Sequence, residues 1–341
     1  MRSAASDFRV YMKITIPELR KLIYQALKTK HYDGKDADRI AEVILFGQLS
    51  NKTSHGIVRL FIAGSSQLAQ KPTGKPKIVI DTPASQIIDA NQNPAMLVMS
   101  LAMEKAMEKA TKVGFAITGT RNTYSTCGSL SYYLEKIAQT NLIGIAMARS
   151  PLCMASFSTA EPLFGTNPVG FAIPAEPQPF IFDMGTTAIS WGALLIAQAT
   201  GKSLPENVAV DETGELTTNP NKAKSLLSFD NTYKGSGLAM IVEILAGILV
   251  GAGFIDMPKR NDWGNFLLVF SPKLVGDVKE FKRKMKMMIE RMKKAKMKVG
   301  EKMRIPGETT IKTRDENLRK GWIEIDDSLM KQFKQYIKDN S

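Results

Sequence analysis

The spacing of apolar and polar residues predicts helices in the first part of the chain. Apolar residues recur every three or four positions over 15–27, 36–49 and 53–68, the period of an amphipathic helix. Thr15 has a proline two residues later and Glu18 at the third position, as at a capped helix N-terminus. We therefore expect a helical N-terminal region.

An α/β pattern follows. Two short apolar runs within 74–91 are separated by Pro83, which predicts paired strands joined by a turn. Helices and strands then alternate as far as a helix that Gly201 ends. We expect helices over 94–113, 128–140 and 187–201, and strands over 114–121, 142–149, 169–175, 179–185 and 265–271. The polar stretch 202–231 is interpreted as a long surface loop, and residues near the end as a short helix, "GWIEID" and a terminal helix.

The longest apolar run, 238–255, is nearly long enough to span a bilayer. It contains Glu243, and a carboxylate in a membrane costs roughly 2.5–3.5 kcal/mol on insertion scales. We therefore predict a buried helix over 236–252 and no membrane segment.

The net charge of the chain changes the predicted fold little. The net charge is +13, and lysines crowd the segment 279–298, but its apolar residues recur at helical spacing. The interpretation is an amphipathic helix with a solvated basic face. No aromatic platform lies between the lysines, so nucleic acid is not the expected partner.

The composition is that of an ordinary globular protein of 341 residues with two cysteines. Cys127 and Cys153 are too few for a disulfide framework and have no CxxC or histidine neighbour. A reducing cytoplasmic compartment and no metal site are expected. Residues 1–11 have no apolar signal core and are interpreted as an extension or remnant before Met12.

The usual nucleotide-binding loops are absent from the sequence. "GSGLAM" at 235–240 lacks the last glycine of GxGxxG. "TGKS" at 200–203 lacks the first glycine of a P-loop and follows a helix, whereas a P-loop must precede one. Both the Rossmann and the P-loop interpretations fail.

The chain has two histidines, His31 in a charged segment after a helix and His55 in "NKTSHGIVRL". On a helix His55 and Arg59, four apart, would share a face. A guanidinium can bind a carboxylate with two hydrogen bonds, while an imidazole exchanges a proton near neutral pH. That pair suits a small 2-hydroxy or 2-oxo acid. A structural histidine and a solvated arginine explain the spacing equally well.

Five motifs in order carry a family resemblance. "SHGIVR", "GTNPVGFAIP", "FDMGTT", "YKGSGL" and "IPGE" resemble the malate/L-lactate dehydrogenase-like family of NAD(P)-dependent oxidoreductases, which includes sulfolactate, ureidoglycolate and diketogulonate enzymes. The matches run from about Ile14 to about Phe333. The resemblance implies a non-Rossmann α/β fold whose cofactor domain rests on a largely antiparallel sheet, with a helical lobe formed by the chain ends.

The implied domains are a helical N-terminal region 12–75, a central cofactor- and substrate-binding domain 76–272 and a C-terminal helical region 273–341 that returns to the first. The resemblance also implies a homodimer.

The resemblance assigns roles residue by residue. His55 is the expected proton donor and acceptor, Arg59 the carboxylate clamp, and Asp183 a cofactor-loop aspartate that we also expect to orient the imidazole. The other expected substrate contacts are Ser54, Thr166 and Asn167. The expected cofactor contacts are Asn122, Phe182, Asp183, Met184, Gly185, Thr186, Thr187, Tyr233, Lys234, Gly307 and Glu308.

One segment departs from the family pattern. Many relatives carry an "NHFG"-like segment after "RN", whereas residues 121–133 read "RNTYSTCGSLSYY" without histidine. This segment therefore lacks the histidine that could otherwise take the acid–base role in place of His55. Ser125 and Thr126 can supply hydroxyl donors there, and Cys127 is interpreted as a packed thiol.

The leading hypothesis is an NAD- or NADP-dependent dehydrogenase for a small 2-hydroxy acid, with malate/oxaloacetate or lactate/pyruvate as first choices. A cyclic imino acid reductase of the piperideine- or pyrroline-2-carboxylate type is the close alternative, since C=N can replace C=O at the same residues. A non-catalytic basic binding protein on the same scaffold is an alternative of another class.

Overall fold

The computed structural model describes residues 11–62, 68, 71–257 and 262–341. The predicted extension over 1–11 lies, apart from Tyr11, outside the described residues. The chain divides into two compact units, one formed by the described residues up to 69 together with 309–341 and the other by 70–308. The segment 273–308, which the sequence interpretation grouped with the C-terminal region, belongs to the second unit.

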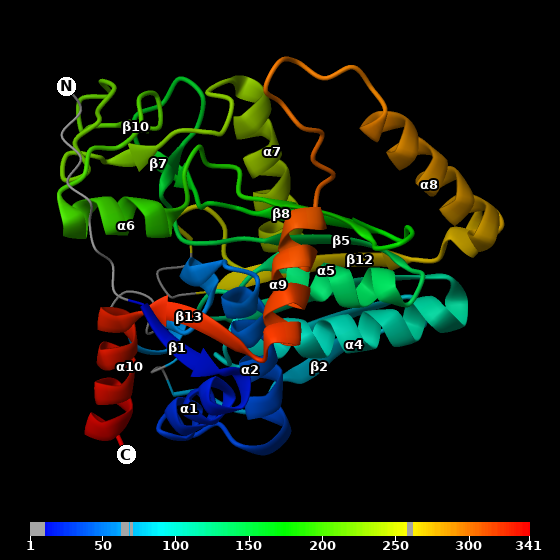
Figure 1. The fold of residues 1–341 in the computed structure, drawn as a ribbon, viewed down its shortest axis with the longest axis horizontal. Helices are drawn as coiled ribbons and strands as arrows, with labels where there is room; N and C mark the ends of the chain where they lie inside the picture. The colour runs from blue at the N-terminus through cyan, green and yellow to red at the C-terminus, as the bar shows by residue number, and fades with distance from the viewer. Residues whose placement is uncertain (1–10, 63–67, 69–70, 258–261) are drawn as a thin grey trace. The chain divides into compact units, whose positions relative to one another are not determined.

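The first unit joins the two ends of the chain through a two-stranded sheet. β1 (Tyr11–Thr15) pairs antiparallel with β13 (Trp322–Asp326), as Figure 1 shows in blue and red. The helices of this unit are α1 (Ile16–Lys28), α2 (Gly34–Leu49), most of α9 (Glu308–Lys320) and α10 (Asp327–Asp339). The Thr15 hydroxyl accepts a hydrogen bond from the Glu18 amide at 3.3 Å, which confirms the predicted cap.

The predicted third helix over 53–68 is wrong. The structure has a 3-10 turn, η1 (Thr53–His55), and a four-residue helix, α3 (Val58–Phe61), separated by Gly56. Gly56 has φ −94° and ψ −146°, which is outside the helical region. A side chain at Gly56 would collide with Gln48 of α2, so tight packing against α2 overrides the helical pattern. Residues 63–67 of the predicted helix lie outside the described part.

The second unit contains a seven-stranded sheet in the order β2-β3-β4-β12-β5-β8-β9, antiparallel except between β3 and β4. The largely antiparallel sheet that the resemblance implies is therefore confirmed. Its strands are β2 (Lys77–Asp81), β3 (Ser85–Asp89), β4 (Phe115–Thr123), β5 (Ile143–Ala148), β8 (Val169–Ile173), β9 (Phe180–Met184) and β12 (Trp263–Phe270).

Helices cover both faces of this sheet (Figure 1). α4 (Ala95–Val113) and α5 (Leu130–Gln139) lie on one face, and α7 (Tyr233–Glu243) with the π turn Ile244–Ile248 on the other. The core on the α7 side brings Val242, Ala246 and Val250 against residues of β5, β8 and β12. Because helices cover both faces of the sheet, the connecting loops lie at the ends of the strands.

The interpretation of 202–231 as a surface loop is wrong in part. β10 (Ala209–Val210) and β11 (Ser225–Leu226) join β6 (Met154–Ala155) and β7 (Pro162–Phe164) in a second sheet. The small core beside it includes residues of α6 (Trp191–Thr200), whose predicted end at Gly201 is confirmed. Strands of two or three residues are too short to produce a visible alternation in the sequence.

The apolar segment 236–252 is only half buried. α7 begins at Tyr233, and its helix changes to a π turn at Ile244, so the predicted single buried helix is wrong in start, form and exposure. Apolar residues surround the helix, and only one stripe of them packs on the sheet. The outward residues are Met240, Ile241, Ile244, Ile248 and Leu249, which are 44–58% exposed. No helix in the described part of the chain is long and apolar enough to cross a membrane.

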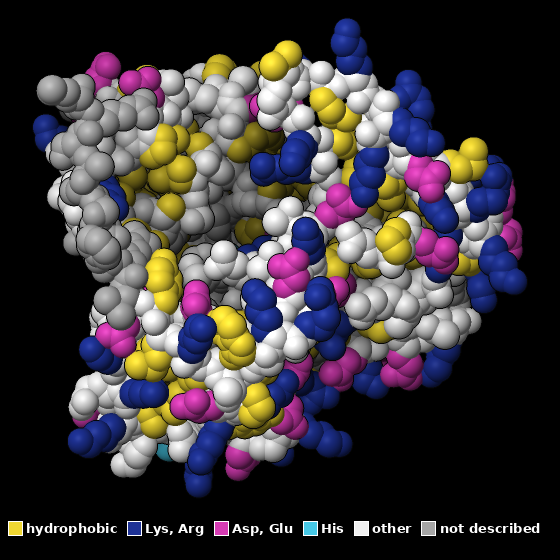
Figure 2. All heavy atoms as spheres, viewed as in Figure 1, with side chains coloured by type: hydrophobic (Ala, Val, Ile, Leu, Met, Phe, Trp, Pro, Cys, Tyr) yellow, Lys and Arg dark blue, Asp and Glu magenta, His cyan; other side chains and the backbone are white. Residues whose placement is uncertain are grey.

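The basic segment forms α8 (Val278–Lys293), shorter than predicted. Its apolar positions are half-buried at most, and Met288 is 47% exposed. Figure 2 shows lysine and arginine side chains crowding the part of the surface where α8 lies in Figure 1. The solvated basic face is therefore confirmed, whereas the apolar side is covered only loosely.

Candidate functional site

Ser54 links His55 and Arg59. The Ser54 hydroxyl lies 3.1 Å from His55 Nδ1, and Arg59 Nε donates a hydrogen bond to the Ser54 carbonyl oxygen at 2.6 Å. All three residues are half-buried, which leaves them reachable by a small molecule. The expectation that His55 and Arg59 share one helix is wrong, because Gly56 interrupts it. Their proximity comes from the turn itself.

Two glycines let α2 hold this turn in place. A Cβ at Gly47 would collide with the His55 carbonyl group, and one at Gly56 would collide with the side chain of Gln48. The Gln48 side-chain oxygen accepts a hydrogen bond from the Ile57 amide at 3.2 Å. The backbone around His55 is therefore fixed by packing and hydrogen bonding to α2. Gly47 and Gln48 escaped the sequence interpretation because their role depends on a close approach of two segments.

His31 has a structural place. It is exposed and adopts φ 65° in the turn after α1, where the sequence interpretation put it.

Asp183, near the end of β9, is tied to the start of α5. Its Oδ2 accepts hydrogen bonds from the hydroxyl of Ser129 at 3.0 Å and from the amide and hydroxyl of Ser131 at 3.0 and 2.8 Å. A carboxylate at a helix N-terminus is favoured by the helix dipole. The serines escaped the sequence interpretation, although serine at the start of a predicted helix is the signal that points to them.

The segment after Asp183 is held against the "GTNP" turn. Thr186 donates two hydrogen bonds to the carbonyl oxygen of Thr166, at 2.9 Å from its amide and 3.1 Å from its hydroxyl. The Thr166 hydroxyl lies 3.1 Å from that of Ser150. Thr187 forms an isolated bridge with Ser228, and a Cβ at Gly185 would find its nearest atom 3.4 Å away. The structure thus brings together two of the predicted motifs.

Asn167 has a structural role in a buried network. Its side-chain amide donates to the Ala239 carbonyl at 3.1 Å and to Glu243 Oε2 at 2.8 Å, and its side-chain oxygen accepts from the Ser150 amide at 3.2 Å. The residue is fully buried at φ 32°. This burial is at odds with the expected substrate contact, because the side chain is enclosed by its partners.

Glu243 is the acidic centre of that network. Its Oε1 accepts from Arg149 Nε at 3.1 Å and from the Ile255 amide at 2.7 Å. Arg149 also donates to the carbonyl oxygens of Ile255 and Asp262. A buried carboxylate needs a charged partner of this kind. The Glu243 carboxylate, on which the prediction of no membrane segment depended, is therefore neutralised by Arg149 inside the fold.

Asn122 lies at the end of β4 with φ 54°. Its side-chain amide donates to Asp89 Oδ1 at 2.9 Å, and its backbone amide donates to Asp262. Burial raises the pKa of the Asp262 carboxyl, while its hydrogen bonds from the backbone amides of Asn122 and Gly253 lower it to a smaller extent. Just beyond, the Ser125 hydroxyl is buried without a hydrogen-bond partner among the described residues.

Tyr233 and Lys234 begin α7 and are exposed. The expectation that this N-terminus favours an anion is met inside the chain by Asp230, whose Oδ1 accepts hydrogen bonds from the amides of Thr232 and Gly235, both at 3.1 Å. The hydrogen bond from the Thr232 hydroxyl is the main cause that lowers the pKa of Asp230. Lys234 keeps an exposed ammonium group beside this cap.

The "IPGE" turn lies along β9. Gly307 adopts φ 93°, and a Cβ there would press on Ile181, whose amide donates to the Pro306 carbonyl at 3.3 Å. Glu308 starts α9 and pairs with Lys293. Phe182 of β9 is partly exposed, and its ring lies 6.5 Å from that of Phe171. β9 and Gly307 thus lie side by side.

Asn122, Asp183 and Met184 lie toward one end of the large sheet, whereas Gly307 packs on Ile181 near the start of β9. The register pairs Met184 with Val169, Val169 with Met147 and Trp263 with Thr123, so β9, β5 and β4 end where β8 and β12 begin. No cluster of histidine, cysteine and acidic side chains suited to a metal ion occurs among the described residues. Cys127 and Cys153 are buried free thiols, and burial raises the pKa of Cys153 to about 12.

Comparisons with known proteins show which family has this architecture. Residues 14–334 match the malate/L-lactate dehydrogenase family. The L-sulfolactate dehydrogenase of Methanocaldococcus jannaschii is 33% identical over 94% of this chain and 95% of its own length. Two solved structures are similar in fold. Malate dehydrogenase from Pyrococcus horikoshii has a TM-score of 0.85 at 26% identity, covering 97% of this chain and 96% of its own. The delta1-piperideine-2-carboxylate reductase from Pseudomonas syringae has a TM-score of 0.83 at 27% identity, covering 95% and 99%.

The resemblance inferred from five short motifs is thereby confirmed over nearly the whole chain, and with it the non-Rossmann fold. Family membership also favours the enzyme hypothesis over a non-catalytic binding protein. The chain belongs to the malate/L-lactate dehydrogenase family.

Proposed function

We propose that the protein is an NAD- or NADP-dependent oxidoreductase that interconverts a small 2-hydroxy acid and its 2-oxo acid. The observation that carries this proposal is the Ser54-centred turn, which holds an imidazole and a guanidinium together on a half-buried surface. A 2-hydroxy acid presents a carboxylate next to the hydroxyl that must lose its proton. The two side chains match these two groups.

His55 is the proposed acid–base residue. In the oxidation it takes the hydroxyl proton as hydride leaves C2, and in the reduction it returns that proton to the oxygen. The hydrogen bond between Ser54 and Nδ1 orients the ring, and such a contact also selects the imidazole tautomer. Close packing of the turn against Gly47 and Gln48 of α2 keeps the ring from moving with a loose loop.

Arg59 is the proposed carboxylate-binding residue. Its Nε is bonded to the Ser54 carbonyl, which limits the rotation of the guanidinium plane. A planar, oriented guanidinium binds a carboxylate more specifically than a flexible ammonium group does. The same contact would serve sulfolactate, malate or lactate, and malate and lactate are the first substrates to test.

The nicotinamide cofactor is proposed to bind the second unit. When bound it supplies or accepts the hydride. The residues there fit such a group in two respects: Lys234 has an exposed ammonium group for a phosphate, and Gly185 leaves room for close approach to the backbone. Asp183 holds the segment 182–187 to α5, and Gly307 packs along β9 behind it. Asp183 is therefore proposed as a positioning residue of this loop.

A cyclic imino acid reductase is the second candidate. The specific support is the fold similarity to delta1-piperideine-2-carboxylate reductase over 95% of the chain. The same Arg59 would bind the ring carboxylate, and His55 would protonate nitrogen in place of oxygen. Direct comparison of substrates separates the two reactions.

The test is an initial-rate assay with NADH and NADPH separately, offering oxaloacetate, pyruvate, sulfopyruvate and delta1-piperideine-2-carboxylate. We expect turnover of one oxo acid, and a fall in kcat of about 10²–10⁴ in His55→Gln, the usual contribution of a general acid. Arg59→Lys should chiefly raise KM. His31→Asn is the matched control, because it removes the other histidine from an exposed left-handed turn that asparagine tolerates. Full activity of His55→Gln would refute the assignment.

We also propose a homodimer. Five outward apolar residues of α7 and the π turn, from Met240 to Leu249, form a contiguous surface that a second copy would bury. Light scattering after size exclusion should give twice the mass of 37.6 kDa. The double variant Ile244→Asp/Ile248→Asp should shift the protein to monomer, whereas Leu318→Asp, an exposed leucine on α9, should not.

A further inference from the structure

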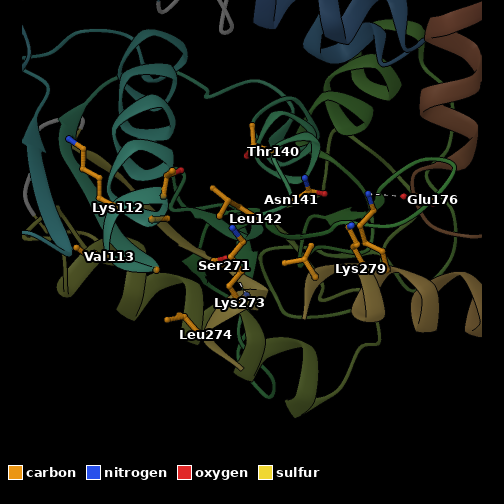
Figure 3. Close-up of a pocket in the computed structure, with 15 residues that line it drawn as sticks. Lys112, Val113, Thr140, Asn141, Leu142, Glu176, Ser271, Lys273, Leu274 and Lys279 are labelled. Carbon is orange, nitrogen blue, oxygen red and sulfur yellow. Dashed lines mark hydrogen bonds and ion pairs between the residues drawn. The ribbon is translucent and has the colours of Figure 1, made fainter. Parts of the chain in front are cut away.

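A pocket lies at the end of the seven-stranded sheet where β4 and β5 begin. It encloses about 750 Å³ and is lined by residues at the start of β4 and β5, the segment after β12 and the first turns of α8 (Figure 3). The length of β4 separates this end from Asn122. β4 runs nine residues from Phe115 to Thr123, a length of roughly 30 Å at the usual rise per residue. The pocket is therefore distinct from Asn122, whereas Gly307 packs on Ile181, which the register places level with Gly144 near the pocket.

Lysine side chains dominate its charge. Lys112, Lys273, Lys279 and Lys282 line the pocket together with a single acidic residue, Glu176. Lys282 pairs with Glu176 at 2.8 Å, and its hydrogen bond lowers the pKa of that carboxyl. Lys112 pairs with Glu108 outside the lining.

Two of these cations lack a counter-charge. Lys273 and Lys279 form no salt bridge within the part of the chain that the structure describes. They flank the start of α8, where Asp277 caps the helix by accepting a hydrogen bond from the Glu280 amide at 2.8 Å, and Glu280 pairs with Arg283 and Lys284. Lys286, one turn beyond Lys282, also lowers the pKa of Glu176. Among the lining residues, lysines thus outnumber carboxylates.

The rest of the lining gives the pocket a mixed character. Leu142 is buried beneath it, and Val113 and Leu274 present apolar surface at its wall. The C-terminal ends of α4 and α5 line the pocket near Val113 and Thr140, where their last carbonyl groups can act as acceptors and the negative ends of their dipoles offset part of the lysine charge. The volume falls within the range of small-molecule sites and exceeds what an isolated inorganic ion needs. An anion carried on a carbon skeleton with hydroxyl groups matches cations, acceptors and apolar wall together.

We propose that this pocket binds a small organic polyanion, a phosphate ester or a polycarboxylate, at the end of the sheet opposite to Asn122. Lys273 and Lys279 are the principal contacts. Helix α5 connects the pocket with the proposed cofactor loop. Thr140 and Asn141 at the end of α5 line the pocket, while Ser129 and Ser131 at the beginning of α5 donate hydrogen bonds to Asp183.

The test is calorimetric titration of the full chain with citrate and, separately, with pyrophosphate, at about 0.1 M salt, where charges farther apart than roughly 10 Å are screened. We expect at least one probe to bind with one site per chain, and Lys273→Gln/Lys279→Gln to weaken it tenfold or more. Binding of citrate alone identifies a polycarboxylate site, and binding of pyrophosphate alone a phosphate site.

Two variants keep the test specific. Lys284→Gln/Lys296→Gln removes the same charge from exposed positions outside the pocket and should leave the affinity within twofold. Lys234→Gln reports binding at the proposed cofactor site instead. The proposal is overturned if neither probe binds up to about 10 mM, if the two lysine pairs weaken binding equally, or if Lys234→Gln alone abolishes it.

Discussion

Charged side chains have opposite surroundings at the two ends of the seven-stranded sheet. At the end that carries Asp183 and Glu243, each carboxylate is committed to partners within the fold, serine donors for one and Arg149 with Asn167 for the other. At the far end, lysines line an open pocket, and those beside α8 remain hydrated. At the first end the charged groups form directed hydrogen bonds. At the far end the exposed lysines attract anions without fixed geometry.

The difference follows from the cost of desolvation. A charge removed from water must be compensated by hydrogen bonds and an opposite charge, and this fixes its geometry. An exposed lysine keeps its hydration and its freedom of rotation, so it attracts anions without fixing their orientation. The ordered end therefore suits a reaction that requires defined distances, while the open end suits recognition of charge.

The largest expected effect comes from breaking the buried pair at the ordered end. Glu243→Ala leaves Arg149 buried without its counter-charge, and we expect the free energy of unfolding to fall by about 3–5 kcal/mol. Thermal unfolding should show a decrease in Tm on the order of 10 °C. Glu290→Ala, an exposed carboxylate on α8, is the control and should change Tm little.

The combined variant Arg149→Met/Glu243→Leu sharpens this test. Replacing both charges with apolar groups removes the uncompensated ion, so the double variant should be more stable than Glu243→Ala. Equal losses in both variants would mean that packing, not charge, decides the stability of this end.

A smaller effect is expected from the carboxylate that α5 holds. Asp183→Asn keeps the shape but presents an amide nitrogen or a weaker acceptor to three donors, and losing hydrogen bonds to a charged group costs about 1.5–3 kcal/mol. We expect a lower Tm and a roughly tenfold rise in the dissociation constant for NADH or NADPH, measured by fluorescence titration.

Asp211→Asn provides the comparison for that variant. Asp211 also accepts three hydrogen bonds, from Thr213 and Glu215, but it lies in an exposed turn. Cofactor affinity should stay unchanged in this control. If both variants weakened cofactor binding alike, the proposed role of Asp183 in positioning its loop would have to be abandoned.

The smallest effect belongs to the open end and depends on pH. The hydrogen bond from Lys282 lowers the pKa of Glu176 below the ordinary carboxyl value of 4.5. Because the folded state favours the ionised form, its stabilisation is present above the ordinary carboxyl pKa and is lost as the pH falls through the lowered value. Glu176→Gln should change Tm little at pH 7 and reduce the acid-induced loss of Tm below pH 4.5.

Glu206→Gln, in an exposed loop, is the reference for this pH series. An identical pH profile for both variants would show that the Lys282 pair makes no measurable contribution, as is common for exposed ion pairs.

Local signals in the sequence were sufficient for much of the fold. The capped start at Thr15, the hairpin around Pro83 and the helix that ends at Gly201 each depend on residues near one another in the chain. The family resemblance rested on motifs of the same kind. Such features can be read without knowing what packs against them.

Long-range packing decided the features that were missed. Gly56 breaks the third helix because Gln48 occupies the space beside it. Asn167 reads as a turn residue, yet its side chain reaches Glu243, 76 positions later. The π turn at Ile244 and the strands within 202–231 likewise depend on neighbours that are distant in sequence.

The pairing of β1 with β13 has a consequence for synthesis. Residues 11–15 emerge early from the ribosome, but their partner strand 322–326 follows some 300 residues later. At about 5–20 residues per second this is a wait of roughly 15–60 s. The intervening unit 70–308 has its own core and can fold during that time. The sheet of the first unit is therefore completed last, only when translation has passed residue 326.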